Sequence, residues 1–455
     1  MAVWSVASLQ SVIDTRRIDA DHYRPKYLRI TALLSWAPPL KQFVQEIIHP
    51  AEFSRRYSDD GWKVVRTQNV RPLRMDFDSN EVFLSEKIAN GLNKNHLRSG
   101  DILITRTGAN FGQCSLFYAE EQPALATSHT FIVRANEKID SAYLALFLNT
   151  TQGRQLIDRG MYGSSQPEIA PRFLLRIPTP RFAESIEAEL AMFVRKAYGL
   201  RKESISLYKQ AQHLLESDLG LDKRSFKKPV GYTAQFSELQ QSRRLDAEYF
   251  DPVASSIVER ISTFDHVRLG ANCNVGNGFP WNSKKFLEDN SGEPVVRIRN
   301  IRPSHIDVEE LSSIDPKYAR NIGFPKAKKG DVIVGMDGIK YFYASLLEGD
   351  CYVNQRVAHL TWHPGAKISP EYATFIINSS IGQAQLLRDM TVATTVGHIT
   401  SRYIFNLLIP FVSNAFHRQI TSLVKQSIDK KQESKRLLYQ AKTRVEQLIE
   451  EAVGS

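Results

Sequence analysis

The chain contains an internal repeat, in which three segments recur in the same order. The matching pairs are Arg16–Pro25 with Arg243–Pro252, Val64–Pro72 with Val295–Pro303, and Gly100–Ile104 with Gly330–Val334. Their offsets are nearly equal (243 − 16 = 227, 295 − 64 = 231 and 330 − 100 = 230). This predicts a tandem duplication of one unit of about 230 residues. It excludes a solenoid, whose repeats span about 20–50 residues. Two copies of one binding unit are expected to read two places on one partner.

The composition is that of a globular protein with a polyanionic partner. Of 455 residues, 42% are hydrophobic and 24% are charged, which argues against disorder. The net charge of +10 favours nucleic acid first and an anionic membrane second. No apolar run reaches membrane-spanning length, and the N-terminus lacks the pattern of a signal peptide. Cys114, Cys273 and Cys351 lie far apart without metal-ligand spacing, which fits a reduced, cytoplasmic protein. We therefore expect no membrane partner and no metal site.

Each half has the same predicted plan of helices and strands. The Arg-Arg-(Ile/Leu)-Asp-Ala segment is expected to form a short helix or turn that Pro25 or Pro252 ends. Val64, Val65 and the residues after each Gly-Asp pair are typical of strands. A helix follows, and in both halves it is expected to continue into the segments 149–153 and 378–382.

A long heptad pattern without proline closes each half and predicts one long helix in each. The apolar residues expected to pack in a coiled coil are Leu190, Phe193, Leu200, Leu207 and Leu214 in the first helix and Val424, Leu438, Val445 and Leu448 in the second. A lone amphipathic helix cannot bury its apolar face, so we expect the two helices to pair as an antiparallel coiled coil with pseudo-two-fold symmetry. In the alternative, each helix packs on its own domain.

No catalytic motif is present. The sequence lacks a Gly-x-Gly-x-x-Gly segment, a phosphate-binding Gly-Lys-Ser/Thr loop and a Gly-x-Ser-x-Gly elbow. Asp331, Asp337 and Lys340 resemble a metal-dependent nuclease site, but the Asp337–Lys340 spacing is one residue too long. His359 and His363 lie in a strand-like pattern that holds them too far apart for one metal ion.

Polar and basic residues at repeated loop positions predict a DNA-binding face. Arginine pairs with guanine and Asn or Gln with adenine in the major groove, and arginine also holds phosphates. The candidates in the first half are Arg66, Gln68, Asn69, Arg71, Arg74, Arg106, Thr107, Asn110, Ser164 and Ser165. The candidates in the second half are Arg297, Arg299, Asn300, Arg302, Lys340, Thr394 and Thr395. The residues around Gly108 and Gly338 differ between halves, as expected of two readers of different sequences.

Taken together, these features resemble the specificity subunits of type I restriction-modification systems. The resemblance covers the whole chain and rests on the tandem domains, the stretch Gly100–Gly108, the stretch Arg244–Pro252 with its echo at Arg17, and a long helix after each domain. It implies an α+β fold of two similar target recognition domains at 1–182 and 243–412. The long spacer helices are expected at 183–222 and 413–455, with a linker at 223–242. Gly335 and Met336 replace Thr105 and Arg106 in the second copy, so contact arginines do not transfer one to one.

The resemblance also implies the partners. Each domain is expected to read one half of a bipartite site in double-stranded DNA, and the helices are expected to set the gap and dock methyltransferase subunits, two in number. A restriction and translocation subunit is expected to join. The chain itself would be no enzyme and hold no cofactor, since S-adenosylmethionine and ATP are expected on the partner subunits. The alternatives are a coiled-coil scaffold that binds acidic proteins and, third, a metal-dependent nuclease.

Overall fold

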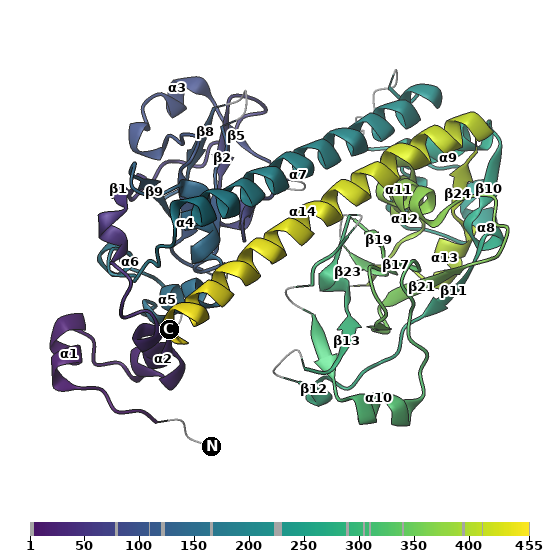
Figure 1. Ribbon diagram of the computed structural model, residues 1–455. Helices are drawn as coiled ribbons and strands as arrows, with labels where there is room; N and C mark the ends of the chain where they lie inside the picture. The colour runs from purple at the N-terminus through teal and green to yellow at the C-terminus, as the bar shows by residue number, and fades with distance from the viewer. Residues whose placement is uncertain are drawn as a thin grey trace. The chain divides into compact units, whose positions relative to one another are not determined.

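The computed structural model separates into two compact units of mixed α and β structure (Figure 1). Unit 1 comprises Met1–Lys202 with Lys431–Ser455, and unit 2 comprises Glu203–Lys430. The structure describes residues 4–77, 81–108, 110–119, 123–163, 167–222, 230–287, 291–303, 305–308, 311–338, 341–393, 396–411 and 413–454. Two long helices, α7 (Glu184–Asp218) and α14 (Asn414–Gly454), each contribute one part to each unit.

An antiparallel four-stranded sheet forms the centre of each unit. In unit 1 its order is β1 (Val44–Ile48), β9 (Thr130–Ala135), β6 (Ile102–Thr105) and β7 (Cys114–Leu116). In unit 2 the order is β11 (Cys273–Asn277), β21 (Val357–Trp362), β17 (Val332–Gly335) and β19 (Ala344–Leu346). The predicted strands after Gly100-Asp101 and Gly330-Asp331 are therefore confirmed, and each is an inner strand of its sheet.

A smaller sheet and a hairpin flank each central sheet. The smaller sheet is β5 (Phe83–Leu84), β2 (Trp62–Val65) and β8 (Ala124–Ala126) in unit 1, and β12 (Phe286–Leu287), β16 (Ser312–Ile314), β13 (Glu293–Val296) and β20 (Tyr352–Val353) in unit 2. The hairpins are β3 (Val70–Arg71) with β4 (Arg74–Met75), and β14 (Ile301–Arg302) with β15 (His305–Ile306).

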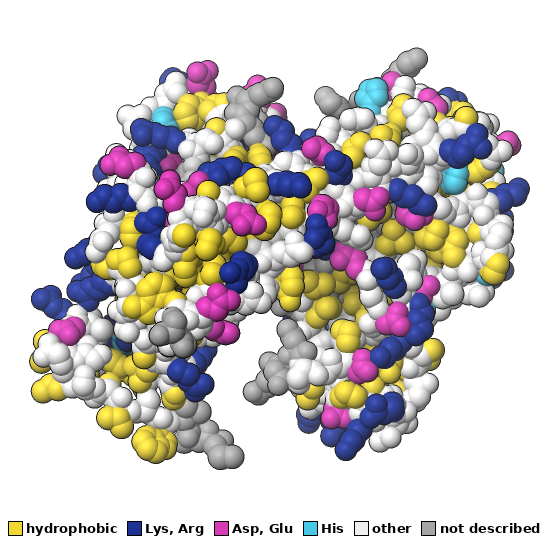
Figure 2. Space-filling view, in the orientation of Figure 1, with side chains coloured by type: hydrophobic (Ala, Val, Ile, Leu, Met, Phe, Trp, Pro, Cys, Tyr) yellow, Lys and Arg dark blue, Asp and Glu magenta, His cyan; other side chains and the backbone are white. Residues whose placement is uncertain are grey.

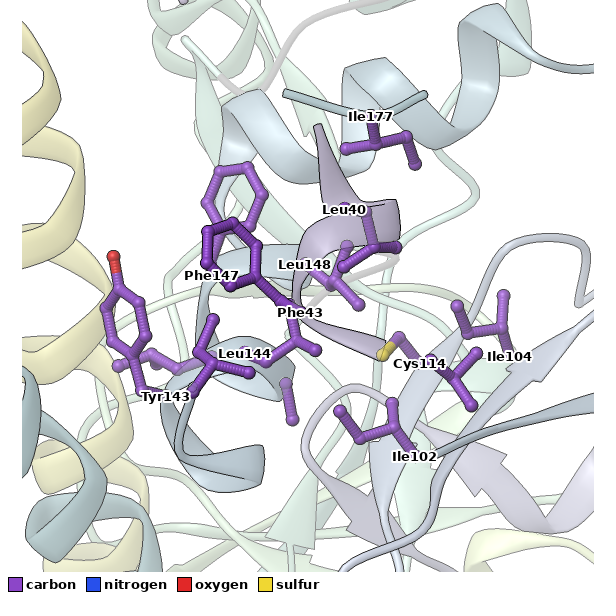
Figure 3. Close-up of a cluster of buried hydrophobic side chains, with 14 of the residues drawn as sticks. Leu40, Phe43, Ile102, Ile104, Cys114, Tyr143, Leu144, Phe147, Leu148 and Ile177 are labelled. Atoms are coloured by element: carbon purple, nitrogen blue, oxygen red, sulfur yellow. The ribbon is translucent and has the colours of Figure 1, made fainter. Parts of the chain in front are cut away.

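In each unit one helix packs on the central sheet, and a second helix packs against the first. They are α4 (Ser141–Leu148) and α5 (Thr151–Arg159) in unit 1, and α11 (Pro370–Asn378) and α12 (Ser380–Asp389) in unit 2. Figure 3 shows Ile102, Ile104 and Cys114 of the unit 1 sheet facing Leu144 and Leu148 of α4, all of them buried. The expected continuous helix is wrong in both units, because each breaks into two.

The repeated Arg-x-Asp motif fastens the start of each unit to the end of its second helix. Arg17 forms an ion pair with Asp19 and donates to the carbonyl of Met161 at 2.7 Å, just after α5. Arg244 pairs with Asp246 in the same way and donates to the carbonyl of Met390 at 2.8 Å, just after α12. The motif is therefore part of the scaffold in each unit.

The prolines after this motif have two functions. The 3-10 helices η1 (Ala20–Tyr23) and η5 (Ala247–Phe250) stop before Pro25 and Pro252, as expected. Each proline also begins a new helix, α2 (Pro25–Leu33) or α9 (Pro252–Ser262), which the sequence reading did not foresee. The fixed φ and missing N–H of proline suit the first position of a helix.

The remaining elements are short. The helices are α1 (Leu9–Thr15), α3 (Glu86–Ala89), α6 (Pro171–Leu174), α8 (Phe236–Ser242), α10 (Pro316–Ile322) and α13 (Ser401–Asn406), and the strands are β10 (His266–Arg268), β18 (Asp337–Gly338), β22 (Thr391–Ala393), β23 (Val396–His398) and β24 (Leu408–Pro410). Among the described helices, none has the length and apolar character that crossing a membrane requires.

Within each unit, the parts of α7 and α14 touch through buried serines. In unit 1, Ser434 Oγ donates to the Ala197 carbonyl at 2.7 Å. In unit 2, Ser204 Oγ donates to the Ser427 carbonyl at 2.7 Å, and Ser427 Oγ donates to the Ser204 carbonyl at 2.8 Å. Small hydroxylated side chains allow two helices to approach closely and satisfy their own polar groups there.

The phase of the predicted apolar pattern on α7 is partly wrong. Leu190 is buried as expected, but Phe193, Leu200, Leu207 and Leu214 are only half-buried. Buried positions instead include Val194 and Leu215, one residue later than Phe193 and Leu214. Positions three and four residues apart lie on the same helix face, so the sequence pattern fits both phases. On α14, Val424, Val445 and Leu448 are buried, whereas Leu438 is half-buried and its neighbour Leu437 is buried.

Candidate nucleic-acid interface

In unit 1, the predicted basic loop residues gather at the end of the central sheet where β6 stops and β7 starts. The hairpin β3–β4 is fixed there, because the Leu73 N–H donates to the Cys114 carbonyl at 3.0 Å. Arg71 Nη1 donates to Asn110 Oδ1 at 3.1 Å, and Asn110 Nδ2 donates to the Thr67 carbonyl at 3.4 Å. The half-buried predicted residues of this region are Arg66, Gln68, Arg71, Arg74, Arg106, Thr107 and Asn110.

Unit 2 has a second basic hairpin, β14–β15, at the position equivalent to β3–β4 in unit 1. Arg302 Nη1 donates to the Arg299 carbonyl at 2.6 Å, and its Nη2 lies 3.6 Å from Asp307 Oδ2. Arg297 lies over the Phe286 ring at 5.4 Å, as Arg66 lies over the Tyr57 ring at 5.8 Å in unit 1. Aromatic contacts of this kind hold a guanidinium in place while leaving its positive charge available.

Asn69 and Asn300 must be withdrawn from the predicted set, because both are buried and hold their own turns. Asn69 Oδ1 accepts the Arg66 N–H at 2.9 Å, and its Nδ2 donates to the Asp76 carbonyl at 2.8 Å. Asn300 Oδ1 accepts the Arg297 N–H at 3.0 Å. Their exposed fractions are 1% and 0%, which leaves no amide edge for a base. Asparagine commonly bonds to its own backbone in this way.

We expect Asn300→Ala to lower the free energy of unfolding by about 1–3 kcal/mol, because it leaves buried backbone groups without partners. Arg299→Ala, at the exposed neighbouring position, should change it by less than about 0.5 kcal/mol. Urea denaturation followed by circular dichroism measures both. A neutral Asn300→Ala variant would contradict the role of a turn scaffold.

Three segments meet beyond the end of the inner strand in each unit, and we call this meeting point the junction. The unit 1 junction consists of Thr107, His129 and Glu168, and the unit 2 junction consists of Asp337, Arg356 and His398. In unit 1 the Arg106 N–H donates to the His129 carbonyl at 2.8 Å, and Thr107 pairs with Glu168. In unit 2 the Met336 N–H donates to the Arg356 carbonyl at 3.0 Å, and Asp337 pairs with His398. The backbone connections are thus equivalent.

The side chains at the unit 1 junction form a network centred on the imidazole of His129, with the Glu168 carboxylate at its edge. His129 Nδ1 lies 3.2 Å from Thr107 Oγ1, and its Nε2 lies 3.0 Å from Arg55 Nη2. Because arginine can only donate, His129 accepts at Nε2 and donates from Nδ1 to the threonine. Nearby, the Tyr162 hydroxyl donates to Glu168 Oε2 at 3.1 Å. Burial, and next this hydrogen bond, raise the pKa of Tyr162, so the phenol stays protonated.

The unit 2 junction is built around a carboxylate instead. Asp337 Oδ1 lies 2.5 Å from His398 Nδ1, and Asp337 Oδ2 lies 3.6 Å from Arg356 Nε. All three side chains are partly exposed. Met336 is buried where unit 1 has the half-buried Arg106, so no basic side chain replaces Arg106 at this position. The same backbone therefore presents different hydrogen-bonding groups in the two units.

The sequence reading missed His129, Glu168, Arg356 and His398. These four residues lie outside the loops that the repeat had singled out. They are nevertheless repeat counterparts, His129 of Arg356 (356 − 129 = 227) and Glu168 of His398 (398 − 168 = 230). Asp337 was considered only as a metal ligand. The described residues contain no group of three or more His, Cys, Asp or Glu that could hold a metal ion. Asp331 accepts the Lys328 N–H and contacts His359 Nε2, both at 2.7 Å.

Five predicted residues, Ser164, Ser165, Lys340, Thr394 and Thr395, lie outside the described residues.

Basic side chains also gather at the end of unit 2 that carries α10 and β12 (Figure 2). The basic residues in and next to these elements are Lys284, Lys285, Lys317 and Arg320. Exposed lysines and arginines of this kind suit the phosphates of a nucleic acid, which they hold without reading sequence.

Comparisons with known proteins give structural similarities only. No protein-family model matches the chain, and no curated protein matches it. The S subunit of a type I restriction-modification system from M. genitalium is similar over 91% of this chain and 94% of its own, with 12% identity and a TM-score of 0.42. The HsdS subunit from Thermoanaerobacter tengcongensis is similar over 91% and 95%, with 15% identity and a TM-score of 0.29. A chain from a structure of the type I R-M system is similar over 92% and 96%, with 14% identity and a TM-score of 0.30.

Proposed function

We propose that this chain is the DNA-sequence specificity subunit of a type I restriction-modification complex. The observation that carries the proposal is the pair of junctions, which have equivalent backbones but different polar side chains. A reader of a split, asymmetric DNA site needs this combination, because both units must approach the duplex similarly while recognising different bases. The resemblance of the sequence motifs to this family supports the same conclusion.

In this proposal each unit reads one half of a bipartite site in double-stranded DNA. The hairpin arginines and the residues of each junction lie in the interface, with Arg66, Arg71 and Arg106 in unit 1 and Arg297, Arg299 and Arg302 in unit 2. Exposed lysines and arginines beside them hold phosphates. The chain contributes recognition and no catalytic group.

The two long helices act as an antiparallel coiled coil that sets the gap between the half-sites. The buried serine contacts within each unit support this, since they place α7 against α14 in both. Two methyltransferase subunits dock on the helices and carry S-adenosylmethionine, and a restriction and translocation subunit uses ATP. The chain works in the cytoplasm, where such a complex meets DNA.

Selection from a randomised duplex library with the full-length chain tests the proposal. We expect enrichment of two short fixed blocks separated by a gap of unspecified sequence. Affinity should fall steeply with salt, by about 10³–10⁵ between 50 and 200 mM if about 6–10 phosphates are contacted. Enrichment of no sequence, alone or with a co-expressed methyltransferase, would refute the proposal. A preference for acidic proteins over duplex DNA would favour the coiled-coil scaffold, and DNA cleavage by the chain alone with magnesium would favour a nuclease.

A further inference from the structure

Arg356 in unit 2 is an exposed arginine with a carboxylate beside its Nε atom. It is the last residue before β21, and its side chain is 51% exposed. Its Nε lies 3.6 Å from Asp337 Oδ2, and the other oxygen of Asp337 is fixed by His398 Nδ1 at 2.5 Å. Within the described part of the chain, neither Nη1 nor Nη2 of Arg356 donates a hydrogen bond to another residue. The carboxylate therefore orients the guanidinium and leaves the outer edge open.

Unit 1 presents an arginine at its own junction from a different segment. Arg55 lies in the loop after β1 and is 55% exposed. Its Nη2 donates to His129 Nε2 at 3.0 Å and lies 3.8 Å from Glu52 Oε1. His129 occupies the position that Arg356 has in unit 2, as the last residue before β9. Thus each junction holds one oriented, half-exposed arginine, although the two arginines are not repeat counterparts.

The neighbouring carboxylates decide between a base and a phosphate as the ligand. A phosphate is itself an anion, so Asp337 beside Arg356 and Glu52 beside Arg55 disfavour it by like-charge repulsion. The edge of a base is neutral, and guanine offers two acceptors, O6 and N7, that match the planar fork of arginine. A carboxylate next to the arginine can also accept the amino group of a cytosine, which belongs to the same kind of base pair.

We infer that each unit recognises a G·C pair through its oriented junction arginine, Arg356 in unit 2 and Arg55 in unit 1. The inference rests on the proposed function and adds the base that each half-site must contain. Asp337 and His129 are positioning residues in this arrangement, since they act through the arginine they contact.

The test is Arg356→Lys in the full-length chain, which keeps the positive charge and removes the bidentate fork. Binding is measured against the enriched duplex and against duplexes with all four base pairs at each fixed position. We expect discrimination to fall by about 5- to 150-fold at one G·C pair of one half-site, with the salt dependence unchanged. Arg55→Lys should do the same at one G·C pair of the other half-site. Asp337→Asn should lower the discrimination at the G·C pair that Arg356 recognises, but by less than Arg356→Lys does.

The matched controls are Arg402→Lys on α13 in unit 2 and Arg172→Lys on α6 in unit 1, both at exposed arginines. They should leave discrimination at every position intact, and equal thermal unfolding midpoints establish that all variants are folded. Undiminished discrimination by Arg356→Lys, an equal weakening on all sequences, or relaxation at an A·T pair would each overturn the inference while the proposed function stands. A wild-type chain that enriches no sequence would refute the proposed function itself.

Discussion

Replacing Gly382 with alanine is expected to lower the free energy of unfolding by about 3 kcal/mol or more. Gly382 lies in the first turn of α12, where this helix passes over the end of α11. A Cβ there would lie 2.3 Å from the Ile376 carbonyl oxygen and 2.5 Å from the Ile377 Cα. Both are backbone atoms, so no side-chain rotation relieves the overlap, and the two helices must separate.

Unit 1 repeats this close approach and also offers a control. A Cβ on Gly153 in α5 would lie 2.1 Å from the Phe147 carbonyl oxygen, so Gly153→Ala should destabilise to a similar degree. Gly199 in α7 has no heavy atom within 4 Å of a built Cβ, and Gly199→Ala should stabilise by about 0.5–1 kcal/mol through helix propensity. Urea denaturation of the three variants gives the comparison. If Gly382→Ala and Gly199→Ala have the same effect, the close packing of α11 on α12 does not contribute to stability.

The same segments explain where the sequence reading of the fold failed. The apolar spacing predicted one continuous helix, but Thr150 Oγ1 accepts the Gly153 N–H at 3.0 Å and starts a new helix there. Asn149 Nδ2 donates to the Cys114 carbonyl at 3.1 Å, on a strand far away in sequence. The cap at Thr150 is local and can be recognised from sequence, whereas the partner of Asn149 depends on the tertiary fold. Strand positions were predictable, because the Gly-Asp turns and the apolar runs are both local signals.

For the candidate site, the sequence predicted the region better than the individual residues. The repeated arginines Arg71 and Arg302 do lie on matching hairpins, since repetition and turn chemistry are visible in the chain. Asn69 and Asn300 were misassigned because an asparagine three residues after its hydrogen-bond partner can be either a turn scaffold or a base reader. His129 and Arg356 could not be found, because their importance arises only where three separate segments meet.

Inserting the same four residues into both long helices, after Lys202 in α7 and after Lys430 in α14, is expected to lengthen the preferred gap by one or two base pairs. In the proposed spacer role, the length and twist of the two helices set the gap. Four residues add about 6 Å of helix and about 40° beyond a full turn. One base pair of DNA adds about 3.4 Å and roughly 35° of turn, so rotation favours one added base pair and length favours two. Both half-sites should keep their sequences, because the junctions are untouched.

Insertion in both helices is required because the buried serine hydrogen bonds between α7 and α14 must keep their partners. The hydrogen bond from Ser434 to Ala197 in unit 1 and those between Ser204 and Ser427 in unit 2 lie on opposite sides of the insertion points, so each survives when both helices grow equally. Insertion in α7 alone should displace these contacts and weaken site-specific binding. As a control, the same four residues placed after Gly231, outside both long helices, should leave the gap unchanged. Selection from a library with every gap length distinguishes these results. A gap that responds to the Gly231 insertion and ignores the paired helix insertion would assign the spacing to the connecting segment instead of the helices.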